Sequence, residues 1–404
     1  MQLSFFKTLR SLKSFNISPQ DLFEKIDAAL ESNIQWKEEA KAHLMKFLYY
    51  MKEIDASDID FGGRGVNNKI WYRVNGSKRA SDHFPNYDSL EIIAIILSCL
   101  NKRHKEDFFK NKNVDFPLSI TMSEYESPAR FRGDVYLEQD DIAVNFRRIN
   151  PFVIMLQDLG FPEQIEQRLN LQNEKFGLTL VTGITGAGKS TTLDAIIDYN
   201  NRTNYAHIVI IGHPIEFLHN SDKCLIRHRD VGPDVLSFRN GTIEALRQDP
   251  DIIVVGEIRD NTTIAALLEI TDSGHKTFST LHTSSAIDSL HRIIAEFPPV
   301  EQPRIRKRLA ETLSVIISQK LVPTIEGKLT LAKEILSIKP SIRAAIINDN
   351  ISEVYQMINE GANEGMITME QDLANLFAAG RITRETAVSF ANNKKRVQQI
   401  LAYI

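Results

Sequence analysis

The segment GITGAGKS, at residues 183–190, strongly limits the folds that this chain can adopt, because it fits the phosphate-binding pattern G-x-x-x-x-G-K-[ST]. The apolar run LTLV precedes the segment and the helical pattern TTLDAIIDY follows it, so the motif has the strand and the helix that it requires. Glycines let backbone N–H groups approach phosphate oxygens, and the start of the helix adds a favourable dipole. The sequence therefore predicts a nucleotide site formed by Gly183, Ile184, Thr185, Gly186, Ala187, Gly188, Lys189, Ser190 and Thr191.

Three of these residues carry separate expectations. Lys189 is expected to counter the charge of the β and γ phosphates, and Ser190 to place its hydroxyl on Mg²⁺. Thr191 is the expected structural residue, capping or packing the first turn of the helix.

A second strand that ends in a carboxylate completes such a site, and Asp251–Glu257 supplies one with the sequence DIIVVGE. Glu257, at the end of this strand, is expected to hold Mg²⁺ through water or to orient the attacking water. The alternative is that Glu257 caps the following helix, with Arg259 as its ion partner.

Strands and helices alternate from residue 163 onward, through GLTLVTG, HIVIIG, DIIVVGE and KTFSTLHT. Near-continuous β-branched strands between helices indicate an α/β fold with a parallel sheet covered on both faces. From Glu301 the chain is expected to be mostly helical, with one β segment at residues 328–336 and a helical carboxy-terminal region from about residue 340.

The amino-terminal part differs in pattern from the rest. Residues 1–50 are predicted to be a helical extension, residues 51–150 a small α+β domain, and residues 151–162 a linker between Pro151 and Pro162. The first twenty residues have helical apolar spacing with three basic residues and no acid. They are expected to pack on their own domain or a partner, with an interfacial membrane helix as the alternative.

The composition excludes several classes of protein. With 48 basic and 52 acidic residues, the net charge of −4 lacks the electrostatic footprint of a dedicated nucleic-acid binder, so no direct nucleic-acid partner is expected. Two distant cysteines form neither a disulfide framework nor a tetracysteine zinc site, which favours a reducing compartment. No run reaches the roughly 18 apolar residues of a membrane span.

Taken together, the motifs resemble those of the hexameric type II/IV secretion-system ATPases and, within that family, those of the twitching-motility (PilT-like) branch. They stand along the chain in the order that is typical of the family. The resemblance runs from about residue 50 to the carboxy terminus. The matching segments are ASDID at 56–60, RFR at 130–132, GITGAGKSTT at 183–192, HPIEF at 213–217, RQDPDIIVVGEIRD at 247–260 and SGHKTFSTLHT at 273–283.

This resemblance implies a RecA-like ATPase domain at residues 163–404 behind a small PAS-like amino-terminal domain, with ATP and Mg²⁺ as cofactors. It further implies a homohexamer that powers pilus retraction and works with an inner-membrane platform protein. Such a protein is cytoplasmic and peripheral to the bacterial inner membrane.

Site residues are also implied position by position. Glu216 would help to activate the hydrolytic water beside Glu257, and His275 and His282 would sense phosphate. Arg130, Arg132 and Arg147 would reach a nucleotide bound mainly by the other domain, within one subunit or across a subunit boundary. Without the resemblance, the histidines read as core or surface residues, the strand arginines as a solvated face with a partner such as Asp134, and Glu216 as a helix cap.

Two departures from the family pattern keep other functions open. Gly212-His213-Pro214 stands where relatives carry Glu-Asp-Pro, which removes two carboxylates, and residues 341–348 match the retraction motif only loosely. The alternatives are a type IVB secretion or conjugation motor and, in a different class, a catalytically silent ATP-binding assembly subunit. The lack of a tetracysteine site argues against the pilus-extension branch.

Overall fold

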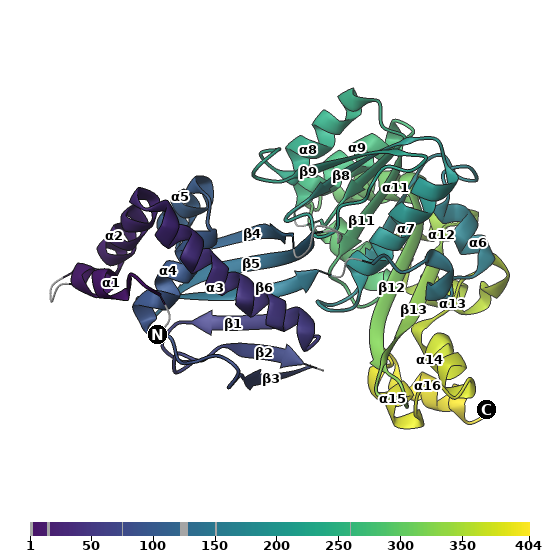
Figure 1. Ribbon diagram of the computed structural model, residues 1–404. Helices are drawn as coiled ribbons and strands as arrows, with labels where there is room; N and C mark the ends of the chain where they lie inside the picture. The colour runs from purple at the N-terminus through teal and green to yellow at the C-terminus, as the bar shows by residue number, and fades with distance from the viewer. Residues whose placement is uncertain (1–2, 14–16, 75, 122–127, 150–151, 259) are drawn as a thin grey trace. The chain divides into compact units, whose positions relative to one another are not determined.

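The computed structural model of the protein describes residues 3–13, 17–74, 76–121, 128–149, 152–258 and 260–404 (Figure 1). The chain divides into an amino-terminal unit, Met1–Pro151, and a carboxy-terminal unit, Phe152–Ile404. Each unit has its own sheet and its own core.

The amino-terminal unit is built on an antiparallel sheet with the strand order β3-β2-β1-β6-β5-β4. Its strands are β1 (Asp58–Gly62), β2 (Trp71–Val74), β3 (Ser77–Ala80), β4 (Asn113–Ile120), β5 (Ala129–Glu138) and β6 (Asp141–Ile149). Its helices are α1 (Phe6–Leu12), α2 (Pro19–Ser32), α3 (Ile34–Glu53), α4 (Ser89–Cys99) and α5 (Lys102–Asn111).

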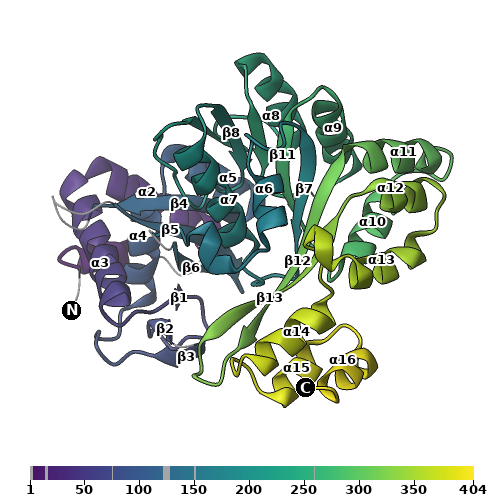
Figure 2. The same ribbon diagram turned by 90° about the vertical axis from the view of Figure 1, so that its right-hand side faces the viewer.

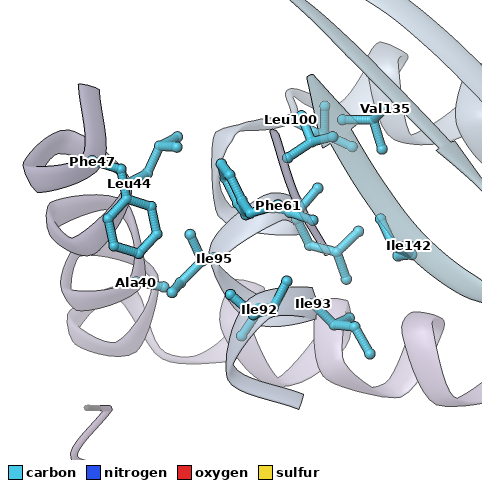
Figure 3. Packing of buried hydrophobic residues seen from close by; sticks show 14 of the residues in the cluster. Ala40, Leu44, Phe47, Phe61, Ile92, Ile93, Ile95, Leu100, Val135 and Ile142 are labelled. Atoms are coloured by element: carbon cyan, nitrogen blue, oxygen red, sulfur yellow. The ribbon is translucent and has the colours of Figure 1, made fainter. Parts of the chain in front are cut away.

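Helix α4 is the apolar centre of this unit. It begins with a capping box between Asp88 and Glu91, and nearly all its residues are buried. Figure 3 shows Ile95 of this helix between Phe47 of α3 and Phe61 of β1. The helices predicted as a separate extension therefore share one hydrophobic core with the sheet.

Helix α1 also packs within the unit, on α4. Leu9 is fully buried, and the backbone N–H of Leu3 donates to Oε1 of Glu91 at 2.8 Å. The basic side chains of Lys7 and Arg10 face solvent. The first helix is thus accounted for by packing on its own domain.

The carboxy-terminal unit has a mainly parallel sheet with the order β13-β12-β7-β11-β10-β8-β9, in which only β13 runs antiparallel to its neighbour. Its strands are β7 (Gly177–Thr182), β8 (His207–Gly212), β9 (Leu225–Asp230), β10 (Ile252–Val255), β11 (Lys276–Leu281), β12 (Leu313–Pro323) and β13 (Leu329–Ser337). Its α-helices are α6 (Glu163–Leu169), α7 (Lys189–Thr203), α8 (Phe238–Ala245), α9 (Asn261–Asp272), α10 (Ala286–Ala295), α11 (Gln302–Thr312), α12 (Pro340–Ile347), α13 (Val354–Glu360), α14 (Met369–Ala378), α15 (Arg384–Phe390) and α16 (Lys394–Leu401).

Both faces of this sheet are covered. Ile252 and Val254 of β10 pack into the core with α6 and α7, whereas Ile253 and Val255 pack into the core on the other face. Alternate residues of a strand point to opposite faces, which explains why the strand is apolar throughout. Figure 2 shows α11, α12 and α13 on one side of the sheet and α6 and α7 on the other. The predicted fold class, a parallel-sheet α/β domain behind an α+β unit with a helical carboxy terminus, is confirmed.

Two strands were not expected. The chain after Glu301 is not mostly helical with one β segment, because β12 precedes β13 and pairs with both β13 and β7. Its apolar run follows α11 without a glycine or proline to mark the boundary, so periodicity alone does not separate it from a helix. Strand β9 lies at the sheet edge within a polar insert, where the alternation of a buried strand is weak.

Candidate active site

The phosphate-binding loop connects β7 to α7. Gly183 passes so close to β12 that a Cβ there would lie 2.6 Å from the carbonyl oxygen of Gln319. Gly188, the residue before α7, has a φ of 83°, in the left-handed region that favours glycine. The two glycines therefore meet requirements of this fold and leave the loop backbone open to a ligand.

The loop divides into exposed and buried residues. Ile184, Thr185, Gly186 and Ser190 are exposed, which suits residues that meet a nucleotide, whereas Ala187 and Lys189 are buried. One expectation is wrong in detail, because Thr191 is exposed while Thr192 is almost fully buried. The packing residue of the first helical turn is Thr192.

Lys189 reaches back over the loop. Its Nζ donates to the carbonyl oxygens of Gly183 at 2.9 Å and Ile184 at 3.1 Å. Burial lowers the pKa of Lys189, and the charge of Glu257 opposes that shift. A buried ammonium that two carbonyl oxygens hold fits a phosphate, whose charged oxygens are stronger acceptors.

Glu257 and His282 lie beside this lysine. Strands β10 and β11 are parallel neighbours, so the residues after their carboxyl ends meet at one edge of the sheet. Nε2 of His282 is 3.8 Å from Oε2 of Glu257, and its Nδ1 is 3.5 Å from Nζ of Lys189. The structure thus gathers Lys189, Glu257 and His282 at the loop.

The capping alternative for Glu257 is wrong, because Asp260 caps α9 by accepting the backbone N–H of Thr263 at 2.8 Å. Arg259, its suggested ion partner, lies outside the described residues. Glu257 therefore does not cap α9; it follows β10 at the end of the sheet where the loop lies.

His275 is not part of this group. It stands just before β11, whereas His282 follows the last residue of the same strand. At about 3.3 Å per residue, the two histidines are separated by roughly 20 Å. Nδ1 of His275 lies 3.0 Å from Oγ of Ser273 instead, so within one subunit the two histidines do not meet.

Glu216 lies in the segment after β8, a strand that is the parallel neighbour of β10. The segment therefore leaves the sheet at the same edge as Glu257, and Glu216 is half-buried there. A carboxylate that the sequence reasoning missed lies near, because Asp230 of β9 pairs with Gly212, and its Oδ1 is 3.7 Å from Nδ1 of His213. Its only signal was the acid that ends the run RHRD.

The predicted arginines lie on the sheet of the amino-terminal unit. Arg132 of β5 stands directly opposite Arg147 of β6. Nε of Arg132 lies 3.0 Å from Oδ2 of Asp115, and Nε of Arg147 lies 2.9 Å from Oδ1 of Asp58. The partner of Arg132 is therefore Asp115 rather than the suggested Asp134.

Like charges directly opposite each other destabilise a strand pair, so an arginine pair there has a cost that the two carboxylates offset. Arg130 precedes Arg132 by two residues on β5, which puts both on one face of the sheet. On this face Asp115 and Asp58 pair with Arg132 and Arg147.

Gln319 of β12 is a loop residue that the sequence did not reveal. Its Nε2 donates to the carbonyl oxygen of Ala187 at 2.8 Å, and the side chain is almost fully buried. It lies far downstream of the motif, and no local pattern marks it. This bond fixes the loop next to Gly188.

Magnesium takes oxygen ligands, and the exposed Ser190 hydroxyl and the Glu257 carboxylate are oxygen donors at this edge of the sheet. These residues fit the predicted metal. Among the helices of the described ranges, none combines the length and the apolar character that crossing a membrane requires.

Comparison with known proteins agrees with this geometry. A family model described as "Type II/IV secretion system protein" matches residues 110–379. The "Type IV pilus retractation ATPase PilT" of Pseudomonas aeruginosa is 39% identical over 315 residues, covering 78% of this chain and 89% of the relative. A "Twitching motility protein" of Neisseria gonorrhoeae is 37% identical over 324 residues, covering 80% and 84%.

Solved structures give the same picture. The "Crystal Structure of the Pilus Retraction Motor PilT and Bound ADP" matches with a TM-score of 0.78 at 33% identity, covering 88% of this chain and 98% of that one. The Legionella pneumophila ATPase DotB shares the fold, with a TM-score of 0.72 at 24% identity. With the phosphate loop, Glu257 and His282 at one edge of its sheet, the chain belongs to the type II/IV secretion system protein family.

Proposed function

We propose that this protein is a Mg²⁺-dependent ATPase that powers type IV pilus retraction, as a homohexamer at the cytoplasmic face of the inner membrane. The observation that carries the proposal is the meeting of Lys189, Glu257 and His282 at the phosphate loop. The similarity to a retraction ATPase over most of both chains supports the pilus role.

The residues at this edge divide the chemistry among them. Lys189 moves its ammonium from the loop carbonyls to the β and γ phosphates when ATP binds, and the loop N–H groups bind the same oxygens. Glu257 orients the attacking water, and Glu216 assists from the segment after β8. Ser190 and Glu257 would hold Mg²⁺, which supplies positive charge to the phosphate oxygens when bound.

The arginines complete the site in this proposal. Arg130, Arg132 and Arg147 bring positive charge to a nucleotide held by the carboxy-terminal unit of an adjacent subunit. Planar guanidinium groups suit bidentate contact with phosphate, and the carboxylates of Asp58 and Asp115 orient two of them.

We propose that a platform protein of the inner membrane is the partner that receives the force. The helix that carries the altered retraction motif, α12, buries Ile342 and Ile346, and Nε of Arg343 donates to the carbonyl oxygen of Ala310 at 2.9 Å. The motif region therefore packs against α11, although its sequence differs from the family pattern.

The decisive experiment compares ATP hydrolysis and bound ATP in the wild type and Glu257→Gln. We expect the variant to retain ATP and to lose hydrolysis by at least about 100-fold, because the amide cannot act as a base. Glu269→Gln, on the exposed face of α9, is the matched control and should hydrolyse as the wild type does. A wild type that binds ATP but turns over no faster than Glu257→Gln would instead be a silent assembly subunit.

The pilus role has its own test in cells. Deleting the gene should abolish twitching and leave surface pili that do not retract, and the Glu257→Gln gene should not restore retraction. Normal twitching with loss of protein or DNA transfer would assign the motor to secretion or conjugation.

A further inference from the structure

One side-chain contact joins the phosphate-loop helix to the segment that carries Glu216. Nε2 of His219 lies 3.0 Å from Oδ1 of Asp194, which belongs to α7. The His219 side chain is almost entirely buried, and that of Asp194 is 26% exposed. The contact therefore connects two parts of the site that are 25 residues apart in sequence.

Each partner lies close in sequence to a residue of the proposed chemistry. Asp194 follows Ser190 by four residues, so the two side chains share one face of α7. His219 follows Glu216 by three residues. The distance between the Ser190 face of the helix and the Glu216 segment is thus set where Asp194 meets His219.

The histidine is itself fixed by its surroundings. Its backbone N–H donates to Nε2 of His228 on β9 at 3.1 Å, and the two rings stack with centroids 6.2 Å apart. The ring of Phe217 packs edge-on against it, with centroids 4.7 Å apart. Because His219 is fixed in this way, its contact with Asp194 also fixes the position of the chain around Glu216.

The same helix holds the segment at a second point. Nδ2 of Asn201 donates to the carbonyl oxygen of Asn220 at 2.9 Å, and its Oδ1 accepts the backbone N–H of Asp222 at 3.0 Å. Asn201 anchors the far side of the segment, which leaves the Asp194 contact as the one nearer to Glu216.

The contact has a defined polarity. A carboxylate only accepts hydrogen bonds, so Nε2 of His219 carries the hydrogen and donates it to Asp194. Neither residue belongs to the phosphate loop, and neither was singled out by a sequence motif. Their contact therefore bears on the position of Glu216, three residues before His219.

We propose that Asp194 and His219 are positioning residues that hold Glu216 in the orientation needed for hydrolysis. This inference rests on the proposed ATPase function and deepens it at the same site. Breaking the contact should slow the chemical step and leave nucleotide binding intact, because the phosphate loop has its own support from Gln319.

The test uses Asp194→Ala and Asp194→Asn in the full-length protein, with Asp198→Ala as the matched control. Asp198 lies one turn further along α7 and pairs with Arg202 at 2.8 Å, within the helix. We expect Asp194→Ala to lower kcat by about 10-fold and to change the KM for ATP by less than about 2-fold. Asp194→Asn keeps a hydrogen-bond acceptor and should lose less, whereas Asp198→Ala should match the wild type.

Hydrogen exchange separates this inference from the proposed function. Amides of residues 214–219 should exchange faster in Asp194→Ala than in Asp198→Ala, while those of β7 and β10 stay unchanged. A kcat for Asp194→Ala equal to that of Asp198→Ala would overturn the positioning role. If the wild type does not hydrolyse ATP at all, the ATPase assignment fails, and unchanged exchange would show that the contact does not hold the segment either.

Discussion

Nε2 of His282 lies 3.8 Å from Oε2 of Glu257, which links the ends of two neighbouring parallel strands. The opposite ring nitrogen, Nδ1, is 3.5 Å from Nζ of Lys189. One imidazole therefore lies beside both the carboxylate that we propose to orient water and the lysine that we propose to meet phosphate. We therefore expect a change in phosphate charge at Lys189 to affect the end of β11 through this ring.

Replacing His282 by Gln is expected to lower kcat by about 10-fold or more, with ATP affinity changed by less than about 3-fold, because the ring positions Glu257 without forming the phosphate loop. Steady-state hydrolysis and binding of a fluorescent ATP analogue measure the two effects. His291→Gln, at an exposed position of α10, is the control. Equal rates for the two variants would remove His282 from the site.

Replacing Lys189 by Ala should weaken ATP binding by at least about 10-fold, since it removes the buried positive charge that faces the phosphates. Equilibrium binding of labelled ATP tests this expectation. Lys175→Ala is the matched control, because Lys175 is exposed and lies outside the loop. ATP bound equally well by both variants would contradict the role of Lys189.

The phosphate loop could be predicted from sequence because all of its requirements are local: two glycines, a lysine and a serine between an apolar strand and a helix. The strands of the parallel sheet were also predictable, since alternate residues of β10 feed two cores and leave a continuous apolar run. Local sequence patterns are therefore sufficient to predict the phosphate loop and the buried strands.

The remaining parts depend on pairings between distant residues. Gln319 supports the loop at Ala187 from a strand 132 residues further along the chain, and Arg147 meets Asp58 across 89 residues. That Thr192 is buried and Thr191 is exposed depends on how α7 is rotated about its axis against the core. No periodicity encodes these contacts, because they arise only when the sheets form.

Gln319→Leu is expected to weaken ATP binding by several-fold, because the carbonyl oxygen of Ala187 loses its buried donor and the loop loses its fixed shape. Titration with labelled ATP reports the change. Gln398→Leu, at an exposed position of α16, should bind ATP as the wild type does. An unchanged affinity in Gln319→Leu would show that the loop keeps its shape without this bond.

Arg132→Ala is expected to lower hydrolysis by at least about 10-fold while ATP binding by the P-loop persists. If the arginine acts across a subunit boundary, mixing Arg132→Ala with Lys189→Ala subunits should restore part of the activity. Each Lys189→Ala subunit would then supply Arg132 to the intact loop of its neighbour.

Two controls make this mixing experiment specific. A chain carrying both substitutions has no Arg132 to supply and should not rescue Arg132→Ala, and Arg79→Ala, at an exposed position of β3, should behave as the wild type does. Mixed assemblies no more active than the separate variants would place the arginine and the phosphates in the same subunit, or remove the arginine from the site.

A last prediction concerns stability and pH, through Glu334 of β13. Burial raises the pKa of this carboxyl from its usual 4.5 to about 7, although it accepts the backbone N–H of Ala286 at 2.8 Å. The folded state therefore favours the protonated form. The stability that it contributes is fully present below pH 4.5 and is lost as the pH rises through about 7.

Glu334→Gln cannot ionise and still offers an acceptor to Ala286, so it should not lose this stability. Between pH 5 and pH 8 the free energy of unfolding of the variant should rise by about 2 kcal/mol relative to the wild type. Urea unfolding followed by labelling of Cys224, which is buried in the carboxy-terminal unit, measures the difference. Glu326→Gln, in the exposed turn after β12, should show no such change with pH. If Glu334→Gln and Glu326→Gln follow the same pH dependence, Glu334 is ionised in the folded protein throughout this range and the α10 N-terminus holds a charged carboxylate.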